Sequence, residues 1–282
     1  MRKEKAIQYT LLALALTAVL SLTIITIFIL REGVPVLLDF GIVRFLTSRV
    51  WAPTQGQFGI LGMIVGTLWV TGGALVVGVP LGLAVAIFVT DYAPPVLADI
   101  LRPAIQLLAG IPSVIYGFIG LKILVPVIRQ YLGGPGLSVL AGALVLGVMI
   151  LPSVIAVSED AIRAVPRLYR DGALALGATH WQSLWRVVLP AARSGIVAGV
   201  VLGMGRAVGE TMAVIMVIGN SLQLPTSLLD PATTLTSNIG LEMAYASGAH
   251  RQALFATGVV LFLFIMLLNL GATFFRRRTI RA

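Results

Sequence analysis

Long runs of apolar residues, separated by short polar segments, make up most of this sequence. The first run extends from Tyr9 to Leu30, and each later run also reaches about 20 residues, the length that a helix needs to cross the hydrocarbon core of a bilayer. The later runs are Phe58 to Val89, Pro103 to Ile128, Leu137 to Val157, Ser194 to Ile218 and Ala253 to Phe275. The pattern therefore predicts an all-α membrane protein with six transmembrane helices.

The second run is too long for one perpendicular crossing and too short for two. We expect one tilted helix that kinks at Pro80 and protrudes on the inner side. Gly78 and Gly82 are four residues apart, which is the spacing of a small-residue contact face between membrane helices. Asp91 to Arg102 is then predicted to form a short inner loop.

The third run contains a break in its helical pattern at Gly110 and Pro112. Irregular backbone at membrane depth is tolerated only where protein or a water-filled path covers it. A half-helix that begins near Pro112 would direct free N–H groups at an anion on such a path. An ordinary proline kink relieved by neighbouring helices explains the same residues, and the sequence leaves both interpretations open.

The fifth run carries two charged residues, Arg206 and Glu210, in an otherwise apolar stretch. They are four residues apart, so we expect them to share a helix face and to pair. Charges at this depth are costly and normally face a bundle interior or a pathway. Arg206 is therefore predicted to contact an anion, with Glu210 holding it in place and Thr211 adding a hydrogen-bonding group. A self-neutralising pair that fixes helix packing is the alternative.

Composition and charge agree with a membrane protein and give its orientation. The mean hydropathy is +1.01 and only 11% of residues are charged, yet the net charge is +9. Most of the basic residues lie in the termini and in the segment from Ser158 to Arg193, which the positive-inside rule places in the cytoplasm. This distribution does not suit nucleic-acid binding. We expect residues 1–57 to form an N-terminal helix with an external segment, and residues 58–282 to form a five-helix core.

Two outer segments carry local signals. Trp51 suits the aromatic belt at a membrane interface. Asp230 followed by Pro231 predicts the start of a short helix, on which Leu235, Ile239 and Met243 would form one apolar stripe. Such a helix would lie on the membrane or contact a soluble binding protein.

The inner segment 158–193 is predicted to contain two short helices. The first runs from Arg167 to Leu176 and ends at Gly177, a residue type that favours helix termination. The second begins with Thr179 and Gln182, which have the spacing of a capping box, and carries Trp181, Leu184 and Trp185. Apolar side chains on a short helix in a polar loop indicate docking into a groove on a partner.

The same segment resembles the EAA loop of ATP-binding-cassette importer permeases. The pattern is carried by Asp171, Gly172 and Ala173, then Gly177, then Leu189 and Pro190 at the expected offsets. The resemblance implies the type I importer permease (MetI-like) fold and docking of this loop on a separate ATPase subunit. A solvated basic loop would explain the arginines without explaining this spacing.

Other stretches narrow the resemblance. GMGRAVGETMAVIMVIGN (203–220), GIPSVIYGFIGL (110–121) and VMILPSVIAVSEDAI (148–162) are similar to phosphate importer permeases of the PstC type. Membership would imply a PstA-type permease as partner, a PstB-type ATPase dimer and a PstS-type phosphate-binding protein. It would also imply that the chain binds no cofactor, that the partner ATPase uses ATP and Mg, and that the pathway includes Gly110, Ser113, Arg206, Glu210 and Thr211.

The sequence offers no ATPase site of its own. Its lysines are Lys3, Lys5 and Lys122, and none follows a glycine as the phosphate-binding loop requires. We therefore expect a permease subunit and not an enzyme. A permease for sulfate or molybdate, or a secondary anion transporter that uses Arg206 and Glu210 with proton coupling, are the alternatives.

Overall fold

The computed structural model describes residues 2–281, with side-chain surroundings for residue 5 and residues 7–271. Six of its helices are long and apolar enough to cross a membrane, which confirms the predicted all-α architecture. They are Ile7–Phe40, Leu61–Tyr92, Ser113–Tyr131, Val139–Arg163, His180–Gly209 and Gly248–Gly271. The basic side chains of Arg2, Lys3 and residues 276–281, on which part of the predicted orientation depends, lie outside the described surroundings.

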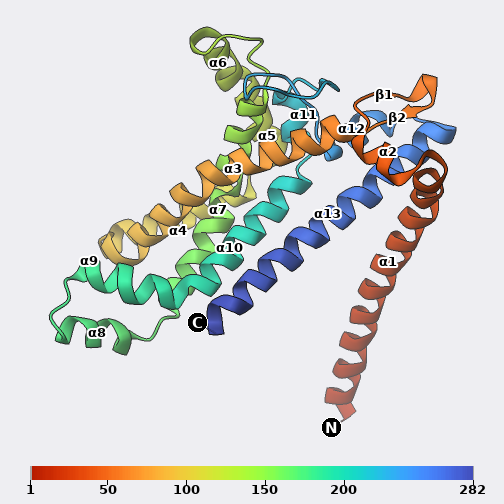
Figure 1. The fold of residues 1–282 in the computed structure, drawn as a ribbon. Coiled ribbons are helices and arrows are strands. Elements are labelled where there is room, and N and C mark those ends of the chain that lie inside the picture. Colours follow the sequence, from red (N-terminus) through yellow and green to blue (C-terminus); the bar gives the residue numbers. More distant parts are fainter. Residues whose placement is uncertain (1, 282) are drawn as a thin grey trace.

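The elements follow one another along the chain as Figure 1 labels them. Most are α-helices, and η2, η3 and η4 are single π-helical turns that continue a neighbouring helix. In order they are α1 (Arg2–Phe40), α2 (Ile42–Thr47), β1 (Trp51–Ala52), η1 (Pro53–Gln55), β2 (Gln57–Phe58), α3 (Leu61–Ile87), η2 (Phe88–Tyr92), α4 (Pro95–Gly110), α5 (Ser113–Ile119), η3 (Gly120–Leu124), α6 (Val125–Tyr131), α7 (Val139–Arg163), α8 (Arg167–Ala175), α9 (His180–Ser183), η4 (Leu184–Val188), α10 (Leu189–Gly209), α11 (Met212–Val217), α12 (Leu235–Glu242) and α13 (Gly248–Arg281).

Helices α3, α7 and α10 pack together at the centre of the molecule. A Cβ atom added at Gly78 would lie 2.7 Å from the carbonyl oxygen of Gly147, and one at Gly82 would lie 2.8 Å from Val154. Helix α3 contains Pro80, as predicted, and α7 contains Pro152. The two glycines of α3 therefore form the expected contact face, and they allow its backbone to approach α7 closely.

The predicted inner loop from Asp91 to Arg102 is wrong. Helix α4 begins at Pro95, since a proline in the first helical turn lacks only an N–H group that has no partner there. Arg102 lies on this helix, and its Nε donates a hydrogen bond of 2.7 Å to the carboxylate of Glu159 on α7. The predicted break after Gly110 is confirmed, and the third crossing begins at Ser113.

The N-terminal region packs against α13 and not only against lipid. Helix α1 continues to Phe40, beyond the expected end at Leu30. Trp51 is 6% exposed in the apolar cluster between this region and α13, so the predicted position in an interfacial aromatic belt is wrong. Its indole N–H donates a 2.9 Å hydrogen bond to Glu242, which explains how the ring is buried with its polar atom satisfied.

The helix predicted after Asp230 also differs from the expectation. It begins later, at Leu235, where Thr234 and Ser237 form a capping box. Asp230 instead closes a turn by accepting hydrogen bonds from Thr226 and Ser227. Residues 235–238 are buried, whereas Gly240 and Leu241 are exposed, so the first half of α12 packs inside the protein and only its second half reaches the surface.

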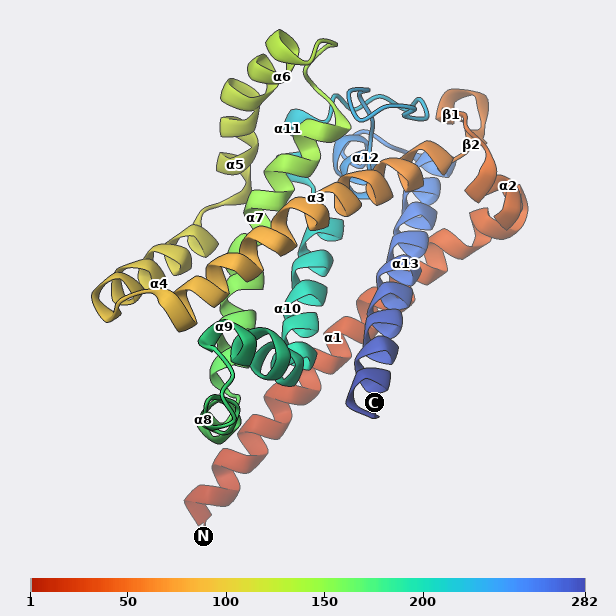
Figure 2. The same ribbon diagram turned by 60° about the vertical axis from the view of Figure 1, so that its left-hand side comes forward.

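Both ends of the described chain lie on the same side of the bundle as α8 and α9. Figures 1 and 2 show the start of α1, the end of α13 and these two short helices at the lower end of the molecule. The strands β1 and β2, together with α6 and α12, lie at the opposite end. The connecting segment between α7 and α10 is thus separated from the outer connections by the length of the helices.

Candidate functional site

The candidate site lies where helix α10 ends and α11 begins. Helix α10 stops at Gly209, and Glu210 has extended backbone angles of φ −71° and ψ 128°. Its carboxylate oxygen Oε1 accepts a hydrogen bond of 3.1 Å from the amide of Ala213, one of the free N–H groups at the start of α11. The expected pairing of Arg206 with Glu210 on one helix face is therefore wrong, because the helix ends between them.

Helix α12 supports this break from the outer side. The hydroxyl group of Thr236 donates a hydrogen bond of 2.9 Å to the backbone carbonyl oxygen of Glu210, which has no partner within α10. A Cβ atom added at Gly240 would lie 2.7 Å from the methyl group of Thr211. Contacts with α12 therefore hold the Glu210–Thr211 segment in its non-helical conformation.

The break that the sequence predicted, between α4 and α5, lies beside this one. The backbone of Ile111 is extended, and Tyr116 on α5 donates a hydrogen bond of 2.8 Å back to the carbonyl oxygen of Leu108 on α4. Helix α5 packs on α11, where an added Cβ at Gly117 would lie 2.8 Å from the Cα atom of Ala213. Two short half-helices, each preceded by irregular backbone, thus run side by side.

Arg206 lies in the last turn of α10, and Tyr116 packs against the apolar cluster that contains the following residue, Ala207. Its side chain is partly exposed, and among the ion pairs of the described residues none involves it. A guanidinium group that no carboxylate neutralises presents several N–H donors in a planar fork, which matches the oxygens of an oxyanion. The site can therefore bind an anion beside the two breaks.

The surface around Arg206 is open. An added Cβ at Gly205, at Gly209 or at Gly110 would meet no atom within 4 Å. Gly110 is the last residue of α4 and Ser113 is the first of α5, so both predicted residues border the break. The structure thus places Gly110 and Ser113 at one break, and Glu210 and Thr211 at the other, with Arg206 in the last turn before it.

The segment 158–193 folds largely as its sequence predicts. Helix α8 begins at Arg167 and is followed by Gly177, whose φ of +86° is favourable only for glycine. Thr179 and Gln182 form the expected capping box. The second helix is not a separate short one, however, since α9 continues through η4 into α10. Leu184 is consequently 1% exposed in the core, whereas we expected it to face a partner.

The remaining residues of the loop pattern lie at two places. Asp171, Gly172 and Ala173 are on α8, where Gly172 faces open space. Leu189 is buried and Pro190 exposed at the start of α10. The apolar side chains that α8, the following turn and α9–η4 expose are Leu168, Tyr169, Leu174, Leu176, Trp181 and Trp185. This exposed apolar surface on the segment 158–193 is suited to docking on another protein.

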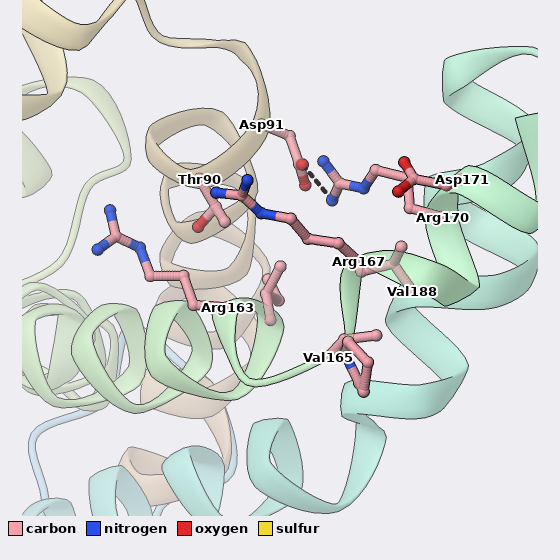
Figure 3. Close-up of a pocket in the computed structure, with 10 residues that line it drawn as sticks. Thr90, Asp91, Arg163, Val165, Arg167, Arg170, Asp171 and Val188 are labelled. Carbon is pink, nitrogen blue, oxygen red and sulfur yellow. Dashed lines mark ion pairs between the residues drawn. The ribbon is translucent and has the colours of Figure 1, made fainter.

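A cavity of 560 Å³ lies between α8, the end of α7 and η2. Figure 3 shows Arg163, Arg167 and Arg170 around it, with the carboxylate of Asp91 directed at Arg170. Arg170 and Asp91 form an ion pair. Arg163 pairs instead with Glu159, at 3.0 Å. The cavity therefore lies where α8 faces η2, the turn that continues α3.

Sequence reasoning missed Tyr116, Thr236 and Asp91. Tyr116 lies four residues after the proline of the break, so its position on the half-helix was available as a signal. Asp91 lies two residues after a long apolar run, and an acid at such a place indicates the end of a membrane helix. Thr236 had no local signal, because only the folded chain brings it to Glu210.

A comparison with protein families matches residues 78–281 to the family described as binding-protein-dependent transport system inner membrane component. The match includes both helix breaks and the whole segment 158–193. It covers more than half of the chain.

Curated relatives are similar over most of their length. The chain is 45% identical over 268 residues to the probable ABC transporter permease protein YqgH of Bacillus subtilis, covering 91% of this chain and 87% of that protein. It is 41% identical over 239 residues to the phosphate transport system permease protein PstC of Pasteurella multocida, covering 78% and 75%. The corresponding protein of Haemophilus influenzae is 40% identical, with 77% and 76% covered.

Solved structures share the fold at low sequence identity. A bacterial ABC transporter involved in the import of the acidic polysaccharide alginate has a TM-score of 0.64 and 19% identity, with 99% of both chains covered. An inward-facing form of the MetNI methionine ABC transporter has a TM-score of 0.63 and 20% identity, with 82% of this chain and 99% of that chain covered. The six-helix architecture is therefore that of importer permeases.

Proposed function

Because the chain belongs to the family of binding-protein-dependent transport system inner membrane components, we propose that it is the permease subunit of an ATP-driven phosphate importer. The observation that carries the choice of phosphate is its 41% identity to a phosphate transport system permease over 78% of the chain. As a family member with six crossing helices, it is a multi-pass inner membrane protein. It supplies one half of the pathway.

The two helix breaks form the anion site in this proposal. Arg206 donates hydrogen bonds to the oxyanion from the last turn of α10. Glu210 keeps α11 in place by accepting the hydrogen bond from Ala213, and does not neutralise Arg206. Gly110, Ser113 and Thr211 line the same path. A second, homologous permease of the PstA type covers the open face beside Gly205 and Gly209 and completes the path.

Energy comes from a separate ATPase. The chain offers no phosphate-binding loop of the ATPase type around its lysines, so it acts as a permease and not as an enzyme. A PstB-type ATPase dimer, with its own ATP and Mg, binds the exposed apolar side chains of α8 and its neighbours. A PstS-type binding protein delivers phosphate at the opposite end. Both chain termini lie in the cytoplasm, on the side of α8.

Uptake of radiolabelled phosphate tests the proposal in cells with and without this chain. We expect uptake to depend on the chain and to be reduced by excess arsenate, which has the same shape and charge, but not by sulfate or molybdate. Uptake of labelled sulfate or molybdate that depends on the chain, without phosphate uptake, would instead identify a permease for that oxyanion. Phosphate uptake that persists without the partner ATPase would identify a secondary transporter.

A further inference from the structure

Helix α8 is attached to the rest of the protein by few side chains. None of its nine residues is buried. Its apolar side chains Leu168, Tyr169 and Leu174 are exposed, and the helix packs mainly on α9 and η4. A force applied to α8 by a bound partner therefore reaches the membrane helices through a small number of specific contacts.

One of these contacts is the ion pair between Arg170 on α8 and Asp91 on η2. The Asp91 side chain is fully buried, with 0% exposure, while that of Arg170 is 29% exposed. Figure 3 shows the guanidinium group of Arg170 directed at this carboxylate across the cavity. Neither Asp91 oxygen has a hydrogen-bond partner in the described part of the chain, so the contact with Arg170 is one of charge. The buried charge is therefore compensated by Arg170, and separating the two is costly.

A ring contact joins the same two regions a second time. Tyr92 of η2 and His180 of α9 stack edge to face, with ring centroids 5.8 Å apart. The turn η2 directly continues α3, so both short cytoplasmic helices contact the inner end of one membrane helix. Helix α3 in turn packs closely on α7 through Gly78 and Gly82. A shift of η2 is thus transmitted into the central helices.

We propose that Asp91 and Arg170 are positioning residues that couple movement of α8 to movement of α3. The pair stays closed while the partner ATPase moves α8, and it pulls the inner end of α3 with it. This inference rests on the proposed function, because a partner that moves α8 is part of that function. It goes further because it names the ion pair that transmits the movement to the membrane helices.

Arg167 decides which substitution tests the pair best. It lies one turn before Arg170 and lines the same cavity, so it remains near Asp91 when Arg170 is removed. Asp91→Asn removes the carboxylate itself. Of the carboxylates of α8, only Asp171 lines this cavity. Asp91→Asn is therefore the primary variant, and Asp91→Asn with Arg170→Gln is the second, in which no buried charge is left unpaired.

The experiment measures phosphate uptake and ATP hydrolysis together in vesicles that contain the assembled complex and its binding protein. For Asp91→Asn we expect phosphate imported per ATP to fall roughly 3- to 30-fold, the range for residues that carry coupling between sites. ATP hydrolysis and co-purification of the subunits continue. Asp91→Glu keeps most of the ratio. The matched control is Asp99→Asn. Asp99 also pairs with an arginine, Arg102, but its side chain is 76% exposed, and among the described residues it forms no ion pair with α8.

The double variant separates a shared role from two independent ones. If the two residues act through each other, Asp91→Asn with Arg170→Gln lowers the ratio no further than Asp91→Asn alone. Any of three results would overturn the inference. These are a ratio in the double variant below that of Asp91→Asn, an unchanged ratio in Asp91→Asn, or uptake and ATP hydrolysis that fall in proportion. If Asp91→Asn does not assemble, the double variant is compared directly with the wild type. A wild-type complex that imports another oxyanion would reject phosphate as substrate, and the same ratio is then measured with that anion.

Discussion

The carboxylate of Glu210 accepts a hydrogen bond from the amide of Ala213, and so it caps the half-helix α11 and does not pair with Arg206. This arrangement separates the two charged residues of the fifth crossing into different tasks. Glu210 stabilises a helix start next to an irregular segment. In the proposed function, Arg206 directs its N–H donors to the anion.

Replacing Arg206 with Ala should lower phosphate uptake by roughly 100-fold or more, because the loss of about 3 kcal/mol of charge-assisted hydrogen bonding corresponds to that factor. Uptake of labelled phosphate by cells carrying the variant measures this. Lys122→Ala is the control, since Lys122 is also a cation within a crossing segment but lies over the ring of Phe118. Uptake at the wild-type rate in Arg206→Ala, with normal amounts in the membrane, would contradict a role in the pathway.

Glu210→Ala and Glu210→Gln should differ in stability. Alanine removes the acceptor for the Ala213 amide and should lower the free energy of unfolding by about 1–2 kcal/mol. Glutamine retains an oxygen that accepts this hydrogen bond and should lose much less. Thermal unfolding of the purified variants in detergent compares them. Equal destabilisation would show that the negative charge, and not the cap, is what the fold requires.

Close packing of α3 on α7 depends on two small residues. Gly78→Ala should destabilise the protein by roughly 1–3 kcal/mol, because the added methyl group would overlap the Gly147 carbonyl and Ile150. Gly72 lies on the same helix and faces open space, so Gly72→Ala should be neutral or slightly stabilising. Unfolding of both variants in the same detergent gives the comparison. A stable Gly78→Ala protein would argue against the close approach of the two helices.

The outer turn at Asp230 should lose stability in acid. Hydrogen bonds from the Thr226 amide, the Thr226 hydroxyl and the Ser227 amide lower the pKa of Asp230 from its usual value of 3.8. A lowered pKa in the folded state means that the carboxylate stabilises the turn above pH 3.8 and stops doing so as the pH falls through the lower, folded-state value.

Hydrogen exchange of the amides of Thr226 and Ser227 measures this effect. At neutral pH, Asp230→Asn should exchange faster than the wild type, because the neutral amide is a weaker acceptor. The difference should shrink once the wild-type carboxylate is protonated. A difference that stays constant over this pH range would mean that the charge of Asp230 does not hold the turn.

The sequence predicted the crossings and the first break because both have strong local causes. Runs of apolar residues specify the helices, and Pro112 cannot continue one. The capping box of Thr179 and Gln182 and the glycine stop at Gly177 are local in the same sense, and both are confirmed.

The errors arise where distant residues decide the conformation. The second break was missed because RAVGETMAV has the pattern of a continuous helix, and Thr236, 26 residues later, holds the Glu210 carbonyl group outside it. Trp51 was expected at a lipid interface because its partner Glu242 lies 191 residues away. Helix α12 was expected to lie on the membrane or to contact a binding protein. Its own sequence does not show that α3, α11 and α13 pack against it.

The most direct test of the account is ATP-driven uptake by the purified complex in vesicles. This chain is reconstituted with its partner permease, the ATPase and the binding protein, and labelled phosphate is followed with ATP or with a non-hydrolysable analogue on the cytoplasmic side. We predict accumulation of phosphate above the external concentration with ATP only, and its loss in Arg206→Ala. Equal accumulation with the analogue, or full uptake by Arg206→Ala, would contradict the account.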